Sequence, residues 1–146
     1  MCKSQNVSAR IRNFRENGDG SFDKGKDGLP AVMWQASYTD FKRHDESAVF
    51  SGLFQLDVDH VENPREIYDS WVLRKDFEDL GIMLAFVTPS GKGLKVVAQM
   101  KPRAGVPNTI PAHQEWLSQQ LDLPEFDVKT KDLARMSFVP LEEDIL

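Results

Sequence analysis

The sequence predicts an α+β domain, because strand-like and helix-like patterns both occur and turn residues separate them. Apolar and polar residues alternate over 53–59, which is the pattern of a strand with one buried face. Two apolar runs, 82–88 and 94–100, flank a glycine-containing turn and predict a β-hairpin. Pro64 and Pro111 each open a segment with helical spacing of apolar residues. A chain of 146 residues with this mixture is typical of one α+β domain.

The N-terminal part is predicted to hold one short helix, two loops and one strand. Ser8 is a candidate N-cap for the helix, which would expose three basic side chains, Arg10, Arg12 and Arg15. Four glycines among polar residues predict a mobile loop over 17–28. A strand is expected over 31–37, and the polar segment 38–48 is expected to be a second mobile loop.

The clearest predicted strand covers 49–59. Its apolar side chains would face the core, namely Phe54, Leu56 and Val58. Pro64 at the first helical position then starts a helix that should run to about Asp79. A second helix opens at Pro111, and the chain closes on an extended run over 135–140.

Composition and charge exclude several classes of protein. No apolar run approaches the roughly 20 residues that a membrane-spanning helix needs. Cys2 is the single cysteine, so no disulfide forms within the chain, and the N-terminus does not read as a secretory signal. We therefore expect a cytoplasmic domain. The formal net charge of -5 disfavours broad wrapping of nucleic acid, so contact with a polynucleotide should be local or metal-mediated.

Asp57 and Asp59 are the first candidate site residues. Residues two apart on a strand point to the same side and lie about 7 Å apart, so the two carboxylates would project together from one sheet face. A cation would relieve the repulsion between them, and oxygen ligands of this kind favour Mg²⁺ or Mn²⁺. The alternative is that the two aspartates lie on a solvated strand face and form no site.

A glycine-flanked turn over 88–95 is the second candidate. The backbone N–H groups of such a turn can cradle an anion, and Lys92 and Lys95 can add positive charge. The turn lacks the spacing of a P-loop, and a strand follows it instead of a helix. The alternative is an ordinary hairpin turn with solubilising lysines.

The third candidate lies near the C-terminus, where Asp127 follows Phe126 and Arg135 comes soon after. Asp127 would complete a three-carboxylate site, with Asp132 as the alternative third ligand. Arg135 would bind a phosphate through its planar fork. The alternative is a surface turn with a salt bridge. The histidines are expected to have surface or core roles and not to bind metal, namely His44, His60 and His113.

Taken in order, these three elements resemble the motifs of the archaeo-eukaryotic primase, or primase-polymerase, superfamily. That pattern is an Asp-x-Asp strand, a turn of the Ser-Gly-x-Gly-x-His type, and an apolar residue and Asp followed by Arg. The matching residues are Leu56-Asp57-Val58-Asp59, Ser90-Gly91-Lys92-Gly93-Leu94-Lys95, and Phe126-Asp127 with Arg135. The resemblance covers about residues 8–140 and looks closest to the N-terminal domain of virulence-associated-protein-E (VirE)-like primase-helicases, with further similarity at 28–30 and 132–138.

The resemblance implies an RRM-like, mainly antiparallel sheet with helices packed on one face. It implies a nucleotidyltransferase that acts in replication of DNA, with Mg²⁺ or Mn²⁺ bound by the catalytic residues Asp57, Asp59 and Asp127. A nucleoside triphosphate would be held by Ser90, Gly91, Lys92, Gly93, Lys95 and Arg135. Many members have His where this chain has Lys95. This change favours nucleotide binding over catalysis, because lysine offers no imidazole-like acid or base near neutral pH.

The resemblance also implies partners and a larger protein. Residues 1–146 would form one domain, the N-terminal part of a protein with a C-terminal helicase domain, and the partners would be nucleoside triphosphate and DNA, single-stranded or as template-primer. Two other functions stay open. One is a non-catalytic module that docks single-stranded DNA or a helicase. The other is a metal-dependent nuclease, for which no general base is evident beside the carboxylates.

Overall fold

The computed structural model of the chain describes residues 2–17, 29–39, 45–123 and 125–146. Most of the two predicted loops, 17–28 and 38–48, lies outside these ranges. Within the second loop, Tyr38 ends a strand and Asp45–Ser47 form a 3₁₀ helix. Regular structure therefore extends further into this segment than the sequence predicted.

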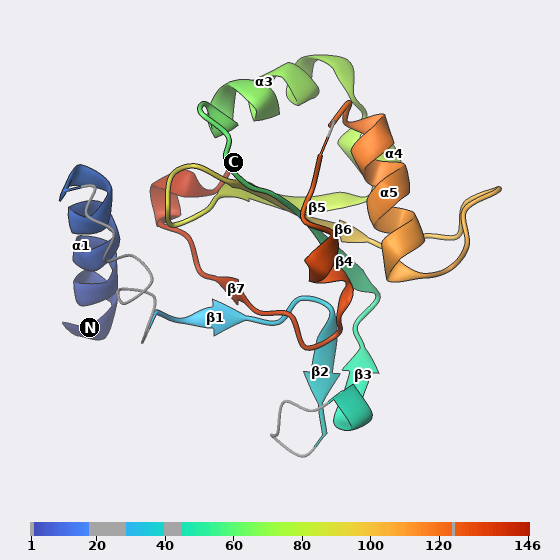
Figure 1. The fold of residues 1–146 in the computed structure, drawn as a ribbon, viewed down its shortest axis with the longest axis horizontal. Coiled ribbons are helices and arrows are strands. Elements are labelled where there is room, and N and C mark those ends of the chain that lie inside the picture. The colour runs from blue at the N-terminus through green and yellow to red at the C-terminus, as the bar shows by residue number, and fades with distance from the viewer. Residues whose placement is uncertain (1, 18–28, 40–44, 124) are drawn as a thin grey trace.

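Helices and strands are interspersed along the chain (Figure 1). In order they are α1 (Cys2–Asn17), β1 (Ala31–Val32), β2 (Ala36–Tyr38), η1 (Asp45–Ser47), β3 (Ala48–Phe50), β4 (Leu53–Val58), α3 (Pro64–Arg74), α4 (Phe77–Leu80), β5 (Ile82–Val87), β6 (Leu94–Gln99), α5 (Ile110–Gln120), η2 (Val128–Lys131), β7 (Ser137–Phe138) and η3 (Glu142–Asp144). The paired strands are antiparallel throughout these ranges. The predicted α+β class is confirmed, as is the hairpin formed by β5 and β6.

The central sheet contains, among the described residues, β4, β6 and β5 in that order. β4 and β5 therefore run parallel on either side of β6, and α3 and α4 connect them (Figure 1). This split β-α-β unit, followed by α5, is compatible with the expected RRM-like arrangement. At the other edge of β4, the backbone N–H of Asp127 donates to the carbonyl of Asp57 at 2.8 Å. The third predicted motif thus lies beside the first.

The main hydrophobic core joins one face of the central sheet to α3 and α5. Phe54, Leu56 and Val58 are buried in it, as their alternation predicted. Trp71 of α3 is also buried, and its Nε1 donates to the carbonyl of Leu121 at 3.0 Å, which links α3 to the end of α5. Because one face of the sheet is used for the core, the polar residues of β4 project from the opposite face.

His113 has a core role, which is one of the two roles expected for the histidines. It is buried, its two ring nitrogens lie 3.0 Å from the carbonyls of Thr109 and Lys101, and its ring packs edge-on against Phe54. His60 is exposed just after β4, whereas His44 falls outside the described residues.

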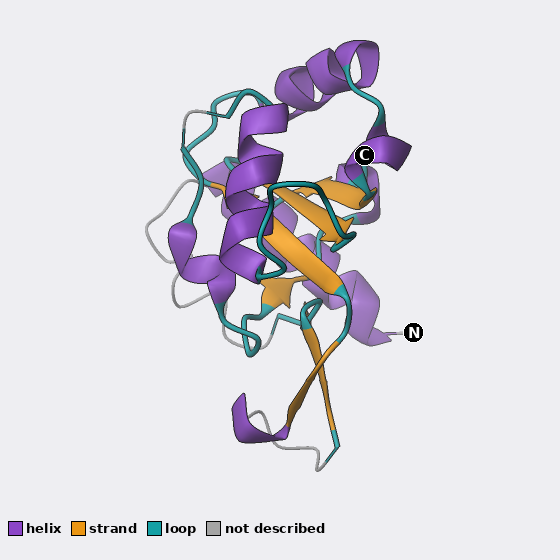
Figure 2. Ribbon diagram, turned by 90° about the vertical axis from the view of Figure 1, so that its right-hand side faces the viewer, coloured by secondary structure: helices purple, strands orange, loops and turns teal. Residues whose placement is uncertain are grey.

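The predicted strand over 49–59 is divided in two. Gly52 has a φ of 86°, a left-handed conformation that favours glycine, and it separates β3 from β4. β3 pairs with β2 in a hairpin that projects from the body of the molecule (Figure 2). The strand predicted over 31–37 is likewise split into β1 and β2. At its far end β4 stops at Val58, so Asp59 lies just beyond the strand.

The helix boundaries also differ from the prediction. α3 ends at Arg74 and does not reach Asp79, because Asp76 caps the short helix α4 by accepting from the backbone N–H of Asp79 at 3.0 Å. α1 begins at Cys2, so Ser8 lies inside the helix and is not its N-cap. These corrections move element ends but do not change the class of fold.

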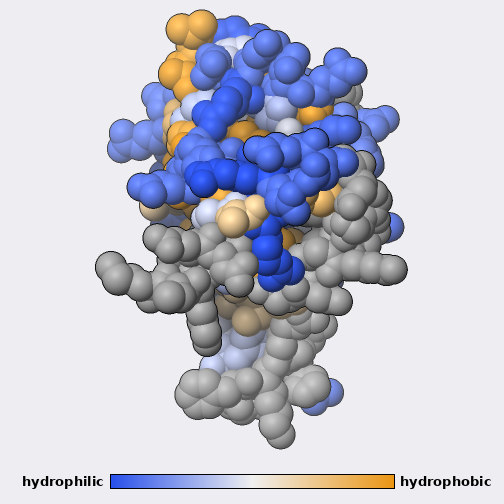
Figure 3. Space-filling model, turned by 90° about the vertical axis from the view of Figure 1, so that its left-hand side faces the viewer, coloured by the Kyte–Doolittle hydropathy of each residue, from blue (hydrophilic) through white to orange (hydrophobic). Residues whose placement is uncertain are grey.

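A second, smaller core packs α1 onto the segments beside β1 and β7. It contains Ile11 of α1 with Leu29 and Leu141. The side of the molecule that carries α1 is mainly hydrophilic where it is described (Figure 3). No helix within the described ranges is both long and apolar enough to cross a membrane.

Candidate functional site

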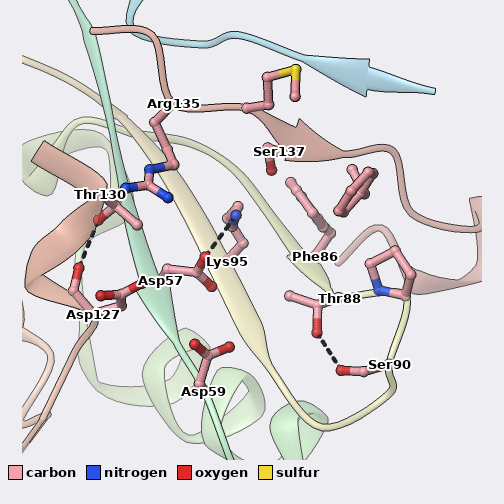
Figure 4. Close-up of a pocket in the computed structure, with 13 residues that line it drawn as sticks. Asp57, Asp59, Phe86, Thr88, Ser90, Lys95, Asp127, Thr130, Arg135 and Ser137 are labelled. Carbon is pink, nitrogen blue, oxygen red and sulfur yellow. Dashed lines mark hydrogen bonds and ion pairs between the residues drawn. The ribbon is translucent and has the colours of Figure 1, made fainter. Parts of the chain in front are cut away.

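Three side chains stand in one row across the face of the central sheet that is opposite the main core. Asp57 on β4, Lys95 on β6 and Phe86 on β5 are register partners, so they project to the same side. Figure 4 shows this row beneath the segment that carries Arg135 and Ser137. The sequence predicted that Asp57 would be on a polar face, but only the strand register places Lys95 opposite it.

Lys95 and Asp57 form a buried ion pair. The Lys95 Nζ lies 2.7 Å from Asp57 Oδ2, and the two side chains are only 7% and 14% exposed. Burial raises the pKa of the Asp57 carboxyl, Lys95 opposes this rise through its charge and hydrogen bond, and the carboxylates of Asp59 and Asp127 add to it. Asp57 Oδ1 is buried and has no hydrogen-bond partner among the described residues. One oxygen of this carboxylate is therefore held by a cation while the other lacks a partner.

The predicted anion-binding turn closes the hairpin between β5 and β6. The backbone N–H of Thr88 donates to the carbonyl of Gly93 at 2.9 Å, and that of Gly91 donates to the carbonyl of Thr88 at 2.8 Å. The hydroxyls of Thr88 and Ser90 lie 3.1 Å apart (Figure 4). A Cβ on Gly93 would lie 2.6 Å from Thr88 Oγ1, so any other residue there would displace the Thr88 side chain. Ser90 lines the pocket, whereas the side chain of Lys92 is exposed outside it.

Arg15 of α1 holds this turn from the N-terminal side of the chain. Its guanidinium donates to the carbonyls of Thr88 and Pro89, both at 3.0 Å. It also pairs at 2.7 Å with Asp144, a carboxylate that is 5% exposed. The prediction that Arg15 is exposed is therefore wrong, because its side chain packs against the turn, whereas the other two arginines of the helix are exposed. Arg15 ties α1, the turn and the C-terminal segment together.

Asp127 and Arg135 reach the pocket from the segment around η2. Asp127 Oδ1 accepts from the backbone N–H of Lys129 at 2.9 Å and so caps η2. Arg135 Nη2 donates to the carbonyl of Lys129 and to the Asp132 carboxylate. Its Nε is buried and has no hydrogen-bond partner among the described residues. Asp132 is exposed and lies outside the pocket lining, so Asp127 is the carboxylate of this motif that faces the pocket.

A buried network of glutamines positions η2, and sequence reasoning missed it. Gln35 Nε2 donates to the carbonyls of Thr130 and Asp132, and its Oε1 accepts from the backbone N–H of Gln55. Gln114 Nε2 donates to the carbonyls of Gln55 and Thr130. Gln35 and Gln114 are at most 1% exposed, so these bonds replace water and hold η2 against the edge of β4. Gln55 takes part through its backbone, and its buried side-chain amide has no hydrogen-bond partner among the described residues. The sequence shows only that a glutamine occurs within an apolar segment. It does not show which groups that glutamine hydrogen-bonds.

The three predicted motifs meet in one cavity of about 280 Å³. Six of the site residues predicted from the sequence line this cavity, namely Asp57, Asp59, Ser90, Lys95, Asp127 and Arg135. Gly91, Lys92 and Gly93 shape or flank the turn without lining the cavity. A second hollow of about 280 Å³ shares Asp59 and Asp127 and extends to His60. The two aspartates therefore border both spaces.

The carboxylates do not form a ready-made metal centre. One oxygen of Asp57 pairs with Lys95, and one oxygen of Asp127 caps η2. In the part of the chain that the structure describes, no group of three or more His, Cys, Asp or Glu side chains is arranged to hold an ion. Lys95 already supplies the positive charge beside Asp57 that the predicted ion would supply. The expected three-ligand centre is therefore not preformed among the described residues, and binding of Mg²⁺ or Mn²⁺ stays a prediction.

The fold and the site define an α+β domain with an ionic pocket on the polar face of an antiparallel sheet. The model of a protein family described as BT4734-like, N-terminal domain, matches residues 24–146, and the chain belongs to this family. No curated protein and no solved structure gives a significant match. All of α1, including Arg15, precedes the matched residues, although Arg15 contacts the turn within them.

Proposed function

We propose that this pocket binds a nucleoside triphosphate and that the chain is a primase-polymerase-like nucleotidyltransferase domain acting in replication of DNA. The observation that carries the proposal is that the three predicted motifs meet in one cavity. Asp57, the turn that contains Ser90, and Arg135 lie far apart in the sequence but line the same cavity. The order of these motifs suggested the resemblance, and their meeting in one place is what a shared nucleotide site requires.

The cations of the pocket suit the phosphates. Arg135 is anchored through Nη2, while its buried Nε–H lacks an acceptor among the described residues. Leaving a buried donor unpaired costs about 1–3 kcal/mol, and a phosphate oxygen would relieve that cost. The pocket carboxylates outnumber Lys95 and Arg135, so a polyphosphate is favoured when it arrives with a divalent cation.

Arg135→Gln tests the pocket by isothermal titration with dATP in a buffer that contains Mn²⁺. We expect the affinity to fall about tenfold or more, because a hydrogen bond to a charged group contributes roughly 1.5–3 kcal/mol. The matched control is Lys131→Gln, which neutralises an exposed lysine of η2 outside the pocket lining and should retain wild-type affinity. Circular dichroism would verify that both variants fold. Equal binding by wild type and Arg135→Gln would remove the support for this pocket.

A second candidate function is a non-catalytic module that binds single-stranded DNA or a helicase. The ion pair between Lys95 and Asp57 favours it, because it occupies a carboxylate that metal-dependent transfer would need. Two ligands, a single-stranded oligonucleotide and dATP, are each titrated in EDTA and in Mn²⁺. The results distinguish the nucleotidyltransferase from the non-catalytic module. The nucleotidyltransferase proposal predicts at least about tenfold weaker dATP binding in EDTA, because phosphate and carboxylates would lose the ion between them. Undiminished binding of DNA in EDTA would instead favour the module.

A further inference from the structure

Ser137 on β7 brings a buried hydroxyl into the cavity, although none of the predicted sites includes it. The residue is 3% exposed and lines the cavity, and its Oγ has no hydrogen-bond partner among the described residues. Its backbone is fixed by pairing with Val32 of β1. A buried hydroxyl without a partner is unfavourable, so its position in a cavity points to an occupant that supplies one.

The surroundings of Ser137 differ from those of the carboxylates. Its chain neighbours Met136 and Phe138 line the cavity, and so do Phe86 and Pro89. In Figure 4 the Ser137 hydroxyl and the Phe86 ring lie on one side of Lys95, while Asp57 and Asp127 lie on the other. The cavity thus has an ionic half and a mainly apolar half. Thr88 and Ser90 also lie on the Phe86 side, but their hydroxyls are 3.1 Å from each other, so the Ser137 hydroxyl is the one of these three without a partner among the described residues (Figure 4).

These two halves suit the two parts of a nucleotide. Phosphates need cations and N–H donors, which Lys95 and Arg135 provide in the ionic half. A nucleoside has apolar ring faces with a few polar atoms, and ligand sites commonly combine an apolar wall with a few placed polar groups. An inorganic anion has no apolar surface to bury against the apolar half.

We propose that Ser137 is a specificity-determining residue whose hydroxyl hydrogen-bonds the nucleoside part of the ligand, so that the pocket prefers a nucleotide to free polyphosphate. This inference rests on the proposed nucleotide binding and adds the residue that distinguishes a nucleotide from free polyphosphate. Ser137 contributes to nucleoside recognition, and Lys95 and Arg135 to phosphate affinity.

Ser137→Ala tests the inference by titration with dATP and with inorganic tripolyphosphate in the same Mn²⁺ buffer. We expect the dATP affinity to fall about fivefold to tenfold and the tripolyphosphate affinity to stay unchanged. The unliganded variant should be as stable as wild type or more stable, because the substitution removes an unpaired buried hydroxyl. Ser118→Ala is the matched control. Ser118 is also buried, but its Oγ donates to the carbonyl of Glu115 at 2.7 Å, so this variant should lose stability and keep wild-type dATP affinity.

Each other outcome has a distinct meaning. Unchanged dATP affinity in Ser137→Ala overturns this inference and leaves nucleotide binding intact. Equal losses for dATP and tripolyphosphate, or a destabilised unliganded variant, assign Ser137 a phosphate or structural role and also overturn it. If the wild-type protein binds neither compound, the proposed function fails and this inference fails with it.

Discussion

Lys95→Met is expected to destabilise the folded domain by about 3–5 kcal/mol, because it leaves the buried Asp57 carboxylate without its cation. Methionine keeps most of the length of the lysine side chain, so the loss comes mainly from charge and not from a cavity. The proposed nucleotide binding should be lost as well. Urea denaturation gives the free energy of unfolding, and titration with dATP gives the affinity.

The loss of stability should depend on pH. The folded-state pKa of Asp57 is raised, mainly by burial, so its ionisation disfavours folding. This penalty is absent below the ordinary pKa range of aspartate, grows as the pH rises from that range to the raised pKa, and is constant above it. Without Lys95 the pKa rises further, so the variant should be closer to wild type at about pH 5 than at about pH 8. An equal loss of stability at both values would contradict the assigned ion pair.

Two controls separate stability from binding in this experiment. Lys95→Met/Asp57→Asn removes both charges and should recover much of the lost stability, because no buried charge is then left unpaired. It should still fail to bind dATP, since the pocket has lost its central cation. Lys92→Met changes an exposed lysine of the neighbouring turn and should shift stability by less than about 0.5 kcal/mol.

Arg15→Ala is expected to cost about 3 kcal/mol of stability, because it removes the closest cation, at 2.7 Å, from the buried Asp144 carboxylate and leaves it with a longer, more exposed ion pair. The remaining partner is Arg65, at 3.7 Å from Asp144 Oδ1. The variant also releases the carbonyls of Thr88 and Pro89, so the turn should lose rigidity. Denaturation would measure the stability, and hydrogen exchange at the turn amides would report the local loosening.

Arg12→Ala is the matched control on the same helix. Arg12 pairs with Glu143 at 3.0 Å, but both side chains are more than half exposed, so solvent screens the pair and its removal should change little. Arg15→Lys should recover only part of the loss, because an ammonium does not reproduce the planar set of donors that reaches two carbonyls and a carboxylate. Equal effects of Arg12→Ala and Arg15→Ala would show that α1 does not hold the turn as described.

Local patterns predicted the elements whose limits are set within one segment. The hairpin of β5 and β6 followed from two apolar runs around a glycine-containing turn, and the helix near Pro111 followed from its proline and apolar spacing. Predictions were wrong where a neighbouring element decides the outcome. The segment 49–59 is split because β3 pairs with β2 instead of continuing β4, and Gly52 permits the break.

The candidate site likewise contains residues that local patterns predicted and residues that only distant contacts reveal. Asp57 and Ser90 were identified because alternation and turn composition are local properties of the sequence. The missed residues, Gln35, Gln114 and Ser137, act through partners or surfaces that are distant in the chain. Burial and hydrogen bonding of a polar side chain depend on what packs over it, and one segment of sequence does not contain that information.

The sequence by itself determined the α+β class, the polar face of β4 and the three motifs in their order. Only the tertiary structure decided that Lys95 stands opposite Asp57 as its counter-charge, because strand register is set by pairing between segments and by burial of one sheet face. It also decided that Arg15 of α1 clamps the turn. Local propensity specifies the elements and their faces, whereas the partner of each charge is chosen when distant segments pack together.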